Sequence, residues 1–138
     1  MAHDLKISNA LAIIEADAAK VRFNNGYLRI YQGTKPASAD DTPTGCTLLA
    51  ELRFAATAYV SQVNGLITMA ALTPEDSALA GGTADWYRAL ESDGTTPIAD
   101  GTCGLGGGGY DCEMATTTIV IGQEVSCTTF THQVRKGA

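Results

Sequence analysis

Histidine is scarce in this chain, and the scarcity limits the catalysis that it can support. Of 138 residues only two are histidine, His3 and His132. Nucleophilic catalysis by serine or cysteine usually needs a neighbouring histidine as base. His3 stands near the N-terminal end, and no partner motif accompanies His132. We therefore expect a protein that is not an enzyme and that has no catalytic residues.

Basic residues are also few. Lys and Arg together number 9 against 15 Asp and Glu, which gives a formal net charge of -6. The basic residues are scattered along the chain, whereas nucleic-acid binding needs a concentrated basic surface to neutralise phosphates. We expect no nucleic-acid partner.

Long apolar runs are missing. The longest nearly apolar stretch, residues 10–19, is interrupted by Glu15 and Asp17, and a helix needs about 20 apolar residues to cross a bilayer. The first residues also lack the basic start and apolar run of a signal peptide. The sequence thus predicts no membrane partner and synthesis in the cytoplasm.

The usual metal and cofactor motifs are absent from the sequence. It has no Cys-x-x-Cys pair of the kind that binds zinc, and Asp40-Asp41 lacks the ligand spacing of a calcium loop. The glycine-rich run 104–109 is followed by Tyr110, whereas a phosphate loop ends in Lys-Ser or Lys-Thr at the start of a helix. We expect no metal and no cofactor.

Four cysteines carry the only unusual side-chain chemistry of the chain. Cys103 and Cys112 flank the glycine-rich run and can meet if that run closes as a loop. A disulfide between them is one prediction, and it would require an oxidising environment. Cys46 and Cys127 are expected to be buried thiols or thiols at a contact between subunits.

Near the N-terminal end, apolar residues recur at the spacing of an amphipathic helix. Asp4 or Ser8 can cap its first turn, and residues 24–26 (Asn-Asn-Gly) tolerate the left-handed conformation that ends a helix. We predict a helix over residues 5–23, within a helical arm over residues 1–25. Its apolar stripe is predicted to dock partly on a neighbouring molecule. The stripe consists of Ile7, Leu11, Ile14, Ala18 and Val21.

From residue 26 onward the sequence is typical of strands and turns. Residues 27–31 and 48–54 alternate between apolar and polar side chains, which favours antiparallel strands with one face on a core. Further strands are predicted over residues 65–71, 83–91, 97–100, 110–114, 116–121 and 124–134. About eight strands with no helices between them predict an all-β fold class. We expect an antiparallel β-sandwich or jelly-roll-like domain over residues 26–138, preceded by one N-terminal amphipathic helix.

The segments between the predicted strands have sequences typical of turns and loops. Residues 92–95 (Ser-Asp-Gly-Thr) and 121–125 are predicted to be tight hairpin turns. Residues 34–44 and 101–109 are rich in Pro, Asp, Thr or Gly and are predicted to be exposed, mobile loops.

Four aromatic residues of the predicted strands have two interpretations. They can form a sugar-binding platform, or they can pack in the core. Trp86 alternates with Arg88 and Leu90, which favours a place in the interior of the sandwich. The four are Tyr27, Tyr31, Trp86 and Tyr87.

Several segments together resemble a family of small proteins encoded among the virion structural genes of tailed bacteriophages and prophages. They are an N-terminal helix followed by GYLRIYQGTKP (residues 26–36), LLAEL (48–52), GTADWYR (82–88), SDGT (92–95) and the Val125-Ser126 strand. The resemblance covers most of the chain. It implies an all-β virion structural protein.

Within that family, the sequence is most compatible with a capsid decoration or cement protein that stabilises the head lattice. Its partners would be other virion proteins, namely the major capsid protein or neck and tail proteins, and it would form a homo-oligomer. One alternative is a neck, collar or tail structural protein. The other is a glycan- or receptor-binding β-sandwich module that uses Trp86, Tyr87 or Tyr110.

Overall fold

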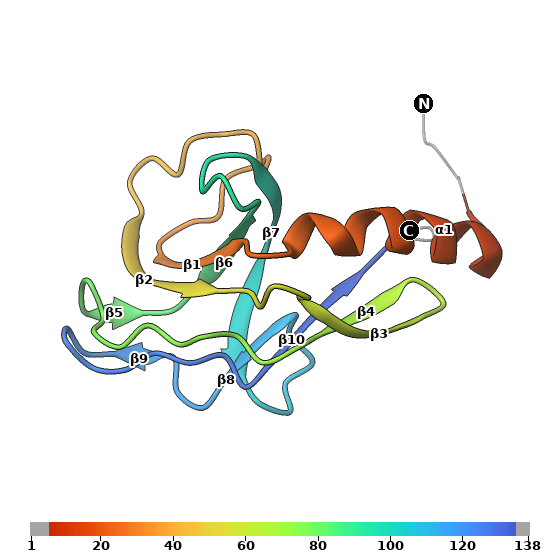
Figure 1. Ribbon diagram of the computed structural model, residues 1–138. Helices are drawn as coiled ribbons and strands as arrows, with labels where there is room; N and C mark the ends of the chain where they lie inside the picture. Colours follow the sequence, from red (N-terminus) through yellow and green to blue (C-terminus); the bar gives the residue numbers. More distant parts are fainter. Residues whose placement is uncertain (1–5, 135–138) are drawn as a thin grey trace.

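The computed structural model describes residues 6–134 (Figure 1). Helix α1 spans Asn9–Lys20 and continues as a short 3-10 turn, η1, over Val21–Phe23. Ser8 caps α1, because its side-chain oxygen accepts a hydrogen bond from the Leu11 amide at 3.1 Å. The turn after η1 contains Asn25 with a φ of 57°. The predicted helix is confirmed over these residues, while its predicted start at Leu5 and the other candidate cap, Asp4, lie outside the described residues.

The rest of the described chain is mostly β. Its strands are β1 (Tyr27–Gln32), β2 (Thr47–Arg53), β3 (Tyr59–Val63), β4 (Leu66–Met69), β5 (Gly82–Thr83), β6 (Trp86–Leu90), β7 (Pro97–Leu105), β8 (Cys112–Met114), β9 (Thr118–Ile119) and β10 (Thr129–Gln133). Eight of them form one sheet in the order β2-β1-β6-β7-β8-β10-β4-β3, and β5 pairs with β9. The predicted predominance of strands is confirmed.

One strand pair departs from the predicted antiparallel sheet. β7 and β8 are parallel, with Cys103 opposite Cys112 and Leu105 opposite Met114. Parallel neighbours normally need a crossover of a dozen or more residues. Here the parallel pairing covers only three residue pairs. The short glycine-rich connection between the two strands can therefore turn the chain back, with positive φ at Gly107 and Gly109.

The prediction of a mobile loop over residues 101–109 was wrong for its first half. Those residues belong to β7, and Gly101, Cys103 and Gly104 are buried. A side chain at Gly101 would collide with the ring of Tyr87. Position 101 therefore requires glycine so that the Tyr87 ring can pack closely against the backbone. The composition of the segment alone does not distinguish such a glycine from one in a flexible loop.

The turn predictions have different outcomes. At residues 92–95 the Asp93 carboxylate accepts the amides of Thr95 and Thr96, each at 2.9 Å. Gly94 takes a φ of 72° there, and the loop joins the paired strands β6 and β7. Residues 121–125 also turn, with a φ of 86° at Gly122. They do not close a hairpin, however, because β9 pairs with β5 and β10 pairs with β8 and β4.

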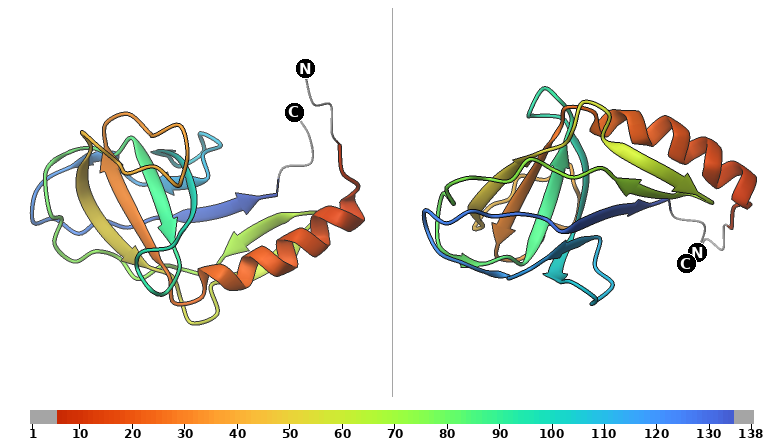
Figure 2. Two further views of the ribbon diagram at one scale, coloured as in Figure 1. Left: turned by 90° about the horizontal axis from the view of Figure 1, so that it is seen from above. Right: turned by 60° about the horizontal axis from the view of Figure 1, so that its bottom comes forward.

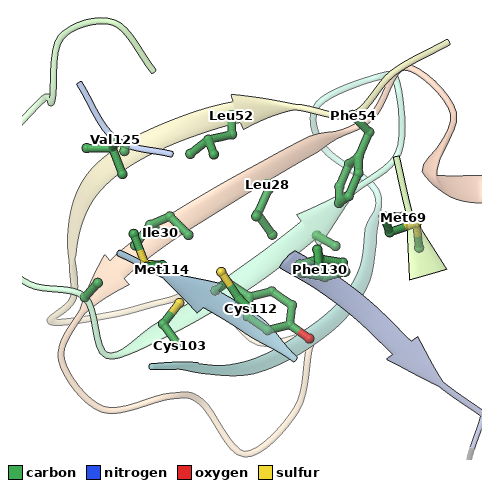
Figure 3. Packing of buried hydrophobic residues seen from close by; sticks show 14 of the residues in the cluster. Leu28, Ile30, Leu52, Phe54, Met69, Cys103, Cys112, Met114, Val125 and Phe130 are labelled. Atoms are coloured by element: carbon green, nitrogen blue, oxygen red, sulfur yellow. The ribbon is translucent and has the colours of Figure 1, made fainter. Parts of the chain in front are cut away.

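The main hydrophobic core contains side chains from both ends of the sheet order (Figure 3). Leu28 and Ile30 from β1, near one end, share it with Ile67 from β4, near the other. The eight-stranded sheet therefore curls around the core. Phe130 of β10 lies at its centre, with its ring centroid 5.0 Å from that of Tyr87 and 5.4 Å from that of Phe54.

Trp86 is buried as predicted, but in a separate cluster on the other face of β6. Its ring stacks on Tyr31 at 4.5 Å between centroids, and both rings lie outside the main core. Beside them, the Arg88 guanidinium donates to both carboxylate oxygens of Asp100 at 2.7 and 2.9 Å. The two faces of β6 thus bury different groups. Tyr87 and Ala89 on one face belong to the main core, whereas Trp86 and Arg88 on the other face form an aromatic and ionic cluster.

The molecule has a body and a projecting arm (Figures 1 and 2). From here on, the arm means α1, the β3–β4 hairpin and the end of β10, and not only the helical arm predicted from the sequence. These elements extend together away from the other strands in all three views. Phe23 joins the arm to the body, because its ring packs 5.3 Å from that of Phe54 between centroids. In residues 6–134, no helix is both long enough and apolar enough to span a membrane.

Candidate functional site

α1 turns its predicted apolar stripe away from the rest of the molecule. Leu11, Ile14 and Val21 are 42%, 65% and 48% exposed. Ala18 is also exposed, and Ile7 is half-buried. The sequence predicted that this stripe would dock partly on a neighbouring molecule, and the described part of the chain leaves most of it exposed.

A second face of α1, made of alanine, packs against the β3–β4 hairpin instead. Ala12 and Ala16 are completely buried. A Cβ atom added to Gly65, in the turn of the hairpin, would lie 3.0 Å from the Cβ of Ala12. Small side chains allow this close approach. With 3.6 residues per turn, Ala12 and Ala16 lie on the side of the helix opposite the stripe.

Polar contacts hold α1 to β3 in this orientation. Gln62 Nε2 donates to Asp17 Oδ1 at 3.2 Å, and Lys20 Nζ lies 3.0 Å from the same oxygen. The Lys20 ammonium also lies 4.6 Å from the centre of the Tyr59 ring. Lys20 lowers the pKa of Asp17, and Gln62 adds to this effect. These contacts keep the stripe pointing outward.

The β3–β4 hairpin was missed by the sequence analysis, which predicted only a strand over residues 65–71. Asn64 and Gly65 connect the strands with φ values of 50° and 93°. Two positive φ values in succession are characteristic of the two-residue turns that Asn-Gly favours. The Asn-Gly pair between two apolar segments was the signal for β3.

The hairpin adds exposed apolar side chains to the arm. Val60, Val63 and Leu66 are 67%, 64% and 39% exposed. Among the described strands, β3 is the last of the sheet and pairs with β4 alone. Exposed edge strands pair readily with other chains. The arm therefore carries large apolar side chains on its helix and on its hairpin, a combination typical of interaction surfaces.

The opposite end of the molecule also exposes apolar side chains. Leu79, Val120 and Ile121 are 52%, 58% and 68% exposed. Their two segments are joined by the Gly122 amide, which donates to the Ala78 carbonyl at 2.9 Å. These residues lie on turns, whereas the stripe of α1 lies along one regular element.

His132 lines a polar pocket of about 340 Å³ in the body, together with Tyr87, Asp100 and Asp111. The Tyr87 hydroxyl donates to Asp111 at 3.4 Å. Burial raises the pKa of Tyr87, and the nearby Asp111 carboxylate raises it further. Burial lowers the pKa of His132. The lining residues contain no serine, threonine or cysteine.

All four cysteines are free thiols. Cys103 and Cys112 lie opposite each other in the β7–β8 pair and both are buried. The structure therefore brings them together as the sequence predicted, while the disulfide between them stays a prediction. Cys127 is half-buried and lies beside Cys112, whereas the half-buried Cys46 is elsewhere and its thiol donates to the Thr34 carbonyl at 3.3 Å.

The proposed sugar platform is largely buried. Trp86 is 1% exposed and Tyr87 is 2% exposed, so neither ring is free to stack on a sugar. Tyr110 is 41% exposed and borders a pocket of about 390 Å³ that also contains Asp85 and Thr102. Of the other two rings of the predicted platform, Tyr31 is buried and Tyr27 is half-buried, so Tyr110 is the most exposed of the five rings considered for sugar binding.

Among the residues that the structure describes, no three His, Cys, Asp or Glu side chains are grouped so that they could hold a metal ion. We compared the chain with protein-family models, with curated proteins and with solved structures, and none of the three comparisons found a match. The exposed stripe of α1 is thus the main structural indication of function.

Proposed function

We propose that this protein is a non-catalytic structural component of a bacteriophage virion, and that the arm binds a neighbouring virion protein. The observation that carries this proposal is the exposed stripe of Leu11 and Ile14 on α1 and Val21 in the adjoining turn η1. The chain folds with its alanine face inward, so the large apolar side chains remain available to a partner. The assignment to a virion comes from the sequence resemblance.

The energetics suit a repeated assembly. Burying a large aliphatic side chain fully contributes about 1.5–3 kcal/mol, and the three stripe residues are already partly covered by their own chain. Each docked arm would therefore gain only a few kcal/mol. A lattice with many copies adds such contacts, as a cement protein on a capsid does.

Within this proposal, the chain is a capsid decoration or cement protein that forms oligomers and contacts the major capsid protein. The finer fold class, a β-sandwich or jelly-roll-like domain, is part of the same proposal and is supported by the curling of the sheet around one core. A neck, collar or tail protein would use the same arm in fewer copies. Glycan binding is supported only by the exposed ring of Tyr110.

Copy number per particle tests the proposal. Virions purified from a phage that encodes this chain should contain it, and quantitative mass spectrometry against the major capsid protein gives the number of copies. Many copies support a decoration protein, and a few copies indicate the neck or tail. If purified virions contain none, the virion assignment is wrong.

A matched pair of variants tests the arm. Ile14→Ser removes an isoleucine that is 65% exposed on the arm, and Ile121→Ser removes one that is 68% exposed at the opposite end. With particles that lack the protein, Ile14→Ser should bind at least about tenfold more weakly than wild type, since about 1.4 kcal/mol of lost apolar contact corresponds to that factor. Ile121→Ser should bind like wild type. Equal binding by Ile14→Ser and wild type would reject the arm as the docking surface.

A further inference from the structure

Two cysteines lie in direct side-chain contact inside the body. The Sγ atoms of Cys112 and Cys127 are 3.5 Å apart. Cys112 is completely buried, whereas Cys127 is half-buried. A disulfide would bring these sulfurs to about 2.05 Å. Only a small rotation or shift of the two side chains separates the observed contact from a bond.

The backbone around both cysteines is fixed by the pairing of β8 with β10. Phe130 lies opposite Cys112 in this pair. Just before β10, the Thr128 amide and hydroxyl both donate to the Glu113 carbonyl, at 2.8 and 2.9 Å. Cys127 is therefore held beside Cys112 by its immediate neighbours in the chain.

Cys103 is the competing partner of Cys112. It lies opposite Cys112 on the adjacent parallel strand, and side chains at opposite positions of two such strands project in parallel directions from the sheet. Cys127 precedes β10 and reaches Cys112 from outside the strand register. The observed Sγ contact of 3.5 Å joins Cys112 to Cys127, and on this contact we take Cys127 as the partner.

We propose that Cys112 and Cys127 form an intrachain disulfide when the folded protein meets an oxidising environment. The bond would close the loop that contains β9 and would fix β8 to the start of β10. This inference does not rest on the function proposed above.

A small-molecule disulfide such as oxidised glutathione is a sufficient oxidant. The Cys127 thiolate, as the more accessible group, attacks one sulfur of the oxidant, forms a mixed disulfide and releases one glutathione thiolate. The Cys112 thiolate then attacks the Cys127 sulfur and releases the second. The two protein thiols lose two protons and two electrons in total, and one glutathione disulfide becomes two thiols.

The surroundings make this reaction slow at neutral pH. Contact with Cys103 and burial raise the pKa of Cys112 and outweigh the contact with Cys127, which lowers it. Contact with Cys112 and burial raise the pKa of Cys127. Since the thiolate is the attacking species, the rate should increase with pH over the mildly alkaline range.

Peptide mapping of the full chain tests the pairing. The folded protein is incubated with oxidised glutathione, free thiols are alkylated in denaturant, and the chain is cleaved after Asp and Glu. Cleavage at Asp111, Glu113 and Glu124 places Cys103, Cys112 and Cys127 on three different peptides. We expect the Cys112 peptide linked to the Cys127 peptide. A predominant Cys103 to Cys112 link, or complete alkylation of all three thiols after incubation, would overturn the proposal.

Two variants and a melting curve add independent readouts. Cys103→Ser should still form the link, whereas Cys127→Ser should not. Oxidised wild type should melt about 5–10 °C above its reduced form, because closing a loop of about 15 residues restricts the unfolded chain. The oxidised and reduced forms of Cys127→Ser should melt together. Loss of the link in Cys103→Ser would show that Cys103 takes part in it.

Discussion

The core of the body and the helix of the arm use large apolar side chains in opposite ways. In the body, Phe130 is 2% exposed and contacts three other aromatic rings. In the arm, Ile14 is 65% exposed while Ala12 and Ala16 of the same helix are buried. Core packing explains the body residues. It does not explain why Leu11 and Ile14 lie on a face of α1 that the fold leaves open.

The difference shows that the hydrophobic stripe of a helix need not be the face that packs within its own chain. α1 packs through alanine because the hairpin turn at Gly65 comes too close for a larger side chain. The stripe is then free for a partner. Stability should depend mainly on the body, and assembly should depend mainly on the arm.

The largest effect is expected in the aromatic core. Phe130→Ala should lower the free energy of unfolding by about 3–5 kcal/mol, because it removes buried area and leaves a cavity. Ile14→Ser should change it by less than about 0.5 kcal/mol, because that side chain is mostly in solvent. Urea unfolding of both variants measures the contrast. A loss of more than 2 kcal/mol for Ile14→Ser would show that the stripe is part of the core after all.

The buried ion pair of the body should come next. Asp100→Ala leaves the Arg88 guanidinium buried without its partner and should cost about 3 kcal/mol. Glu51→Ala breaks the Arg29–Glu51 pair, which has an equally short distance of 2.7 Å but side chains that are 30% and 32% exposed. It should cost less than about 1 kcal/mol. Equal losses in urea unfolding would mean that burial does not distinguish the two pairs.

The contact between α1 and the hairpin should have an intermediate effect. Gly65 has a φ of 93° and lies against Ala12, so Gly65→Ala should cost about 1–2 kcal/mol. Gly106→Ala is the matched control, because a Cβ atom there meets nothing within 4 Å. Hydrogen exchange should also speed up at α1 in Gly65→Ala alone. Unchanged exchange at α1 would show that the helix does not depend on this close approach.

The smallest effect is a pH dependence that arises from His132. Burial lowers the pKa of His132, so the folded protein favours the neutral ring. The stability that this residue contributes is present above the unfolded pKa of about 6.5 and is lost as pH falls below it. Between pH 7.5 and 5, His132→Gln should therefore lose less stability than wild type, by under about 1 kcal/mol. The free energy of unfolding is measured against pH for both proteins, and two curves that run parallel would contradict this effect.

Much of this architecture could be read from local signals. The cap at Ser8, the alternation in β1 and the Asp-Gly turn after β6 all act within a few residues. The curl of the sheet and the parallel β7–β8 pair depend on contacts far apart in the chain, and a local pattern does not contain them. Gly101 was taken for a loop residue because composition does not separate a glycine that bends the chain from one that admits a neighbouring ring.

The candidate surface was predicted in part. The stripe of α1 was identified from its spacing, but which face of the helix packs inward depends on Gly65, which is distant in sequence. The exposed residues of β3 were missed because the Asn64-Gly65 turn was not recognised. The closeness of Cys112 to Cys127 also depends on the pairing of β8 with β10.

Hydroxyl-radical footprinting of α1 tests the central claim most directly. The isolated chain and purified virions are labelled under the same conditions, and modification is quantified at Leu11, Ile14 and Val21. We predict strong labelling of these residues in the isolated chain and clear protection in the virion, with Leu28 and Phe130 protected in both. Labelling of the stripe that is equally strong in the virion, or that is already weak in the isolated chain, would contradict the account.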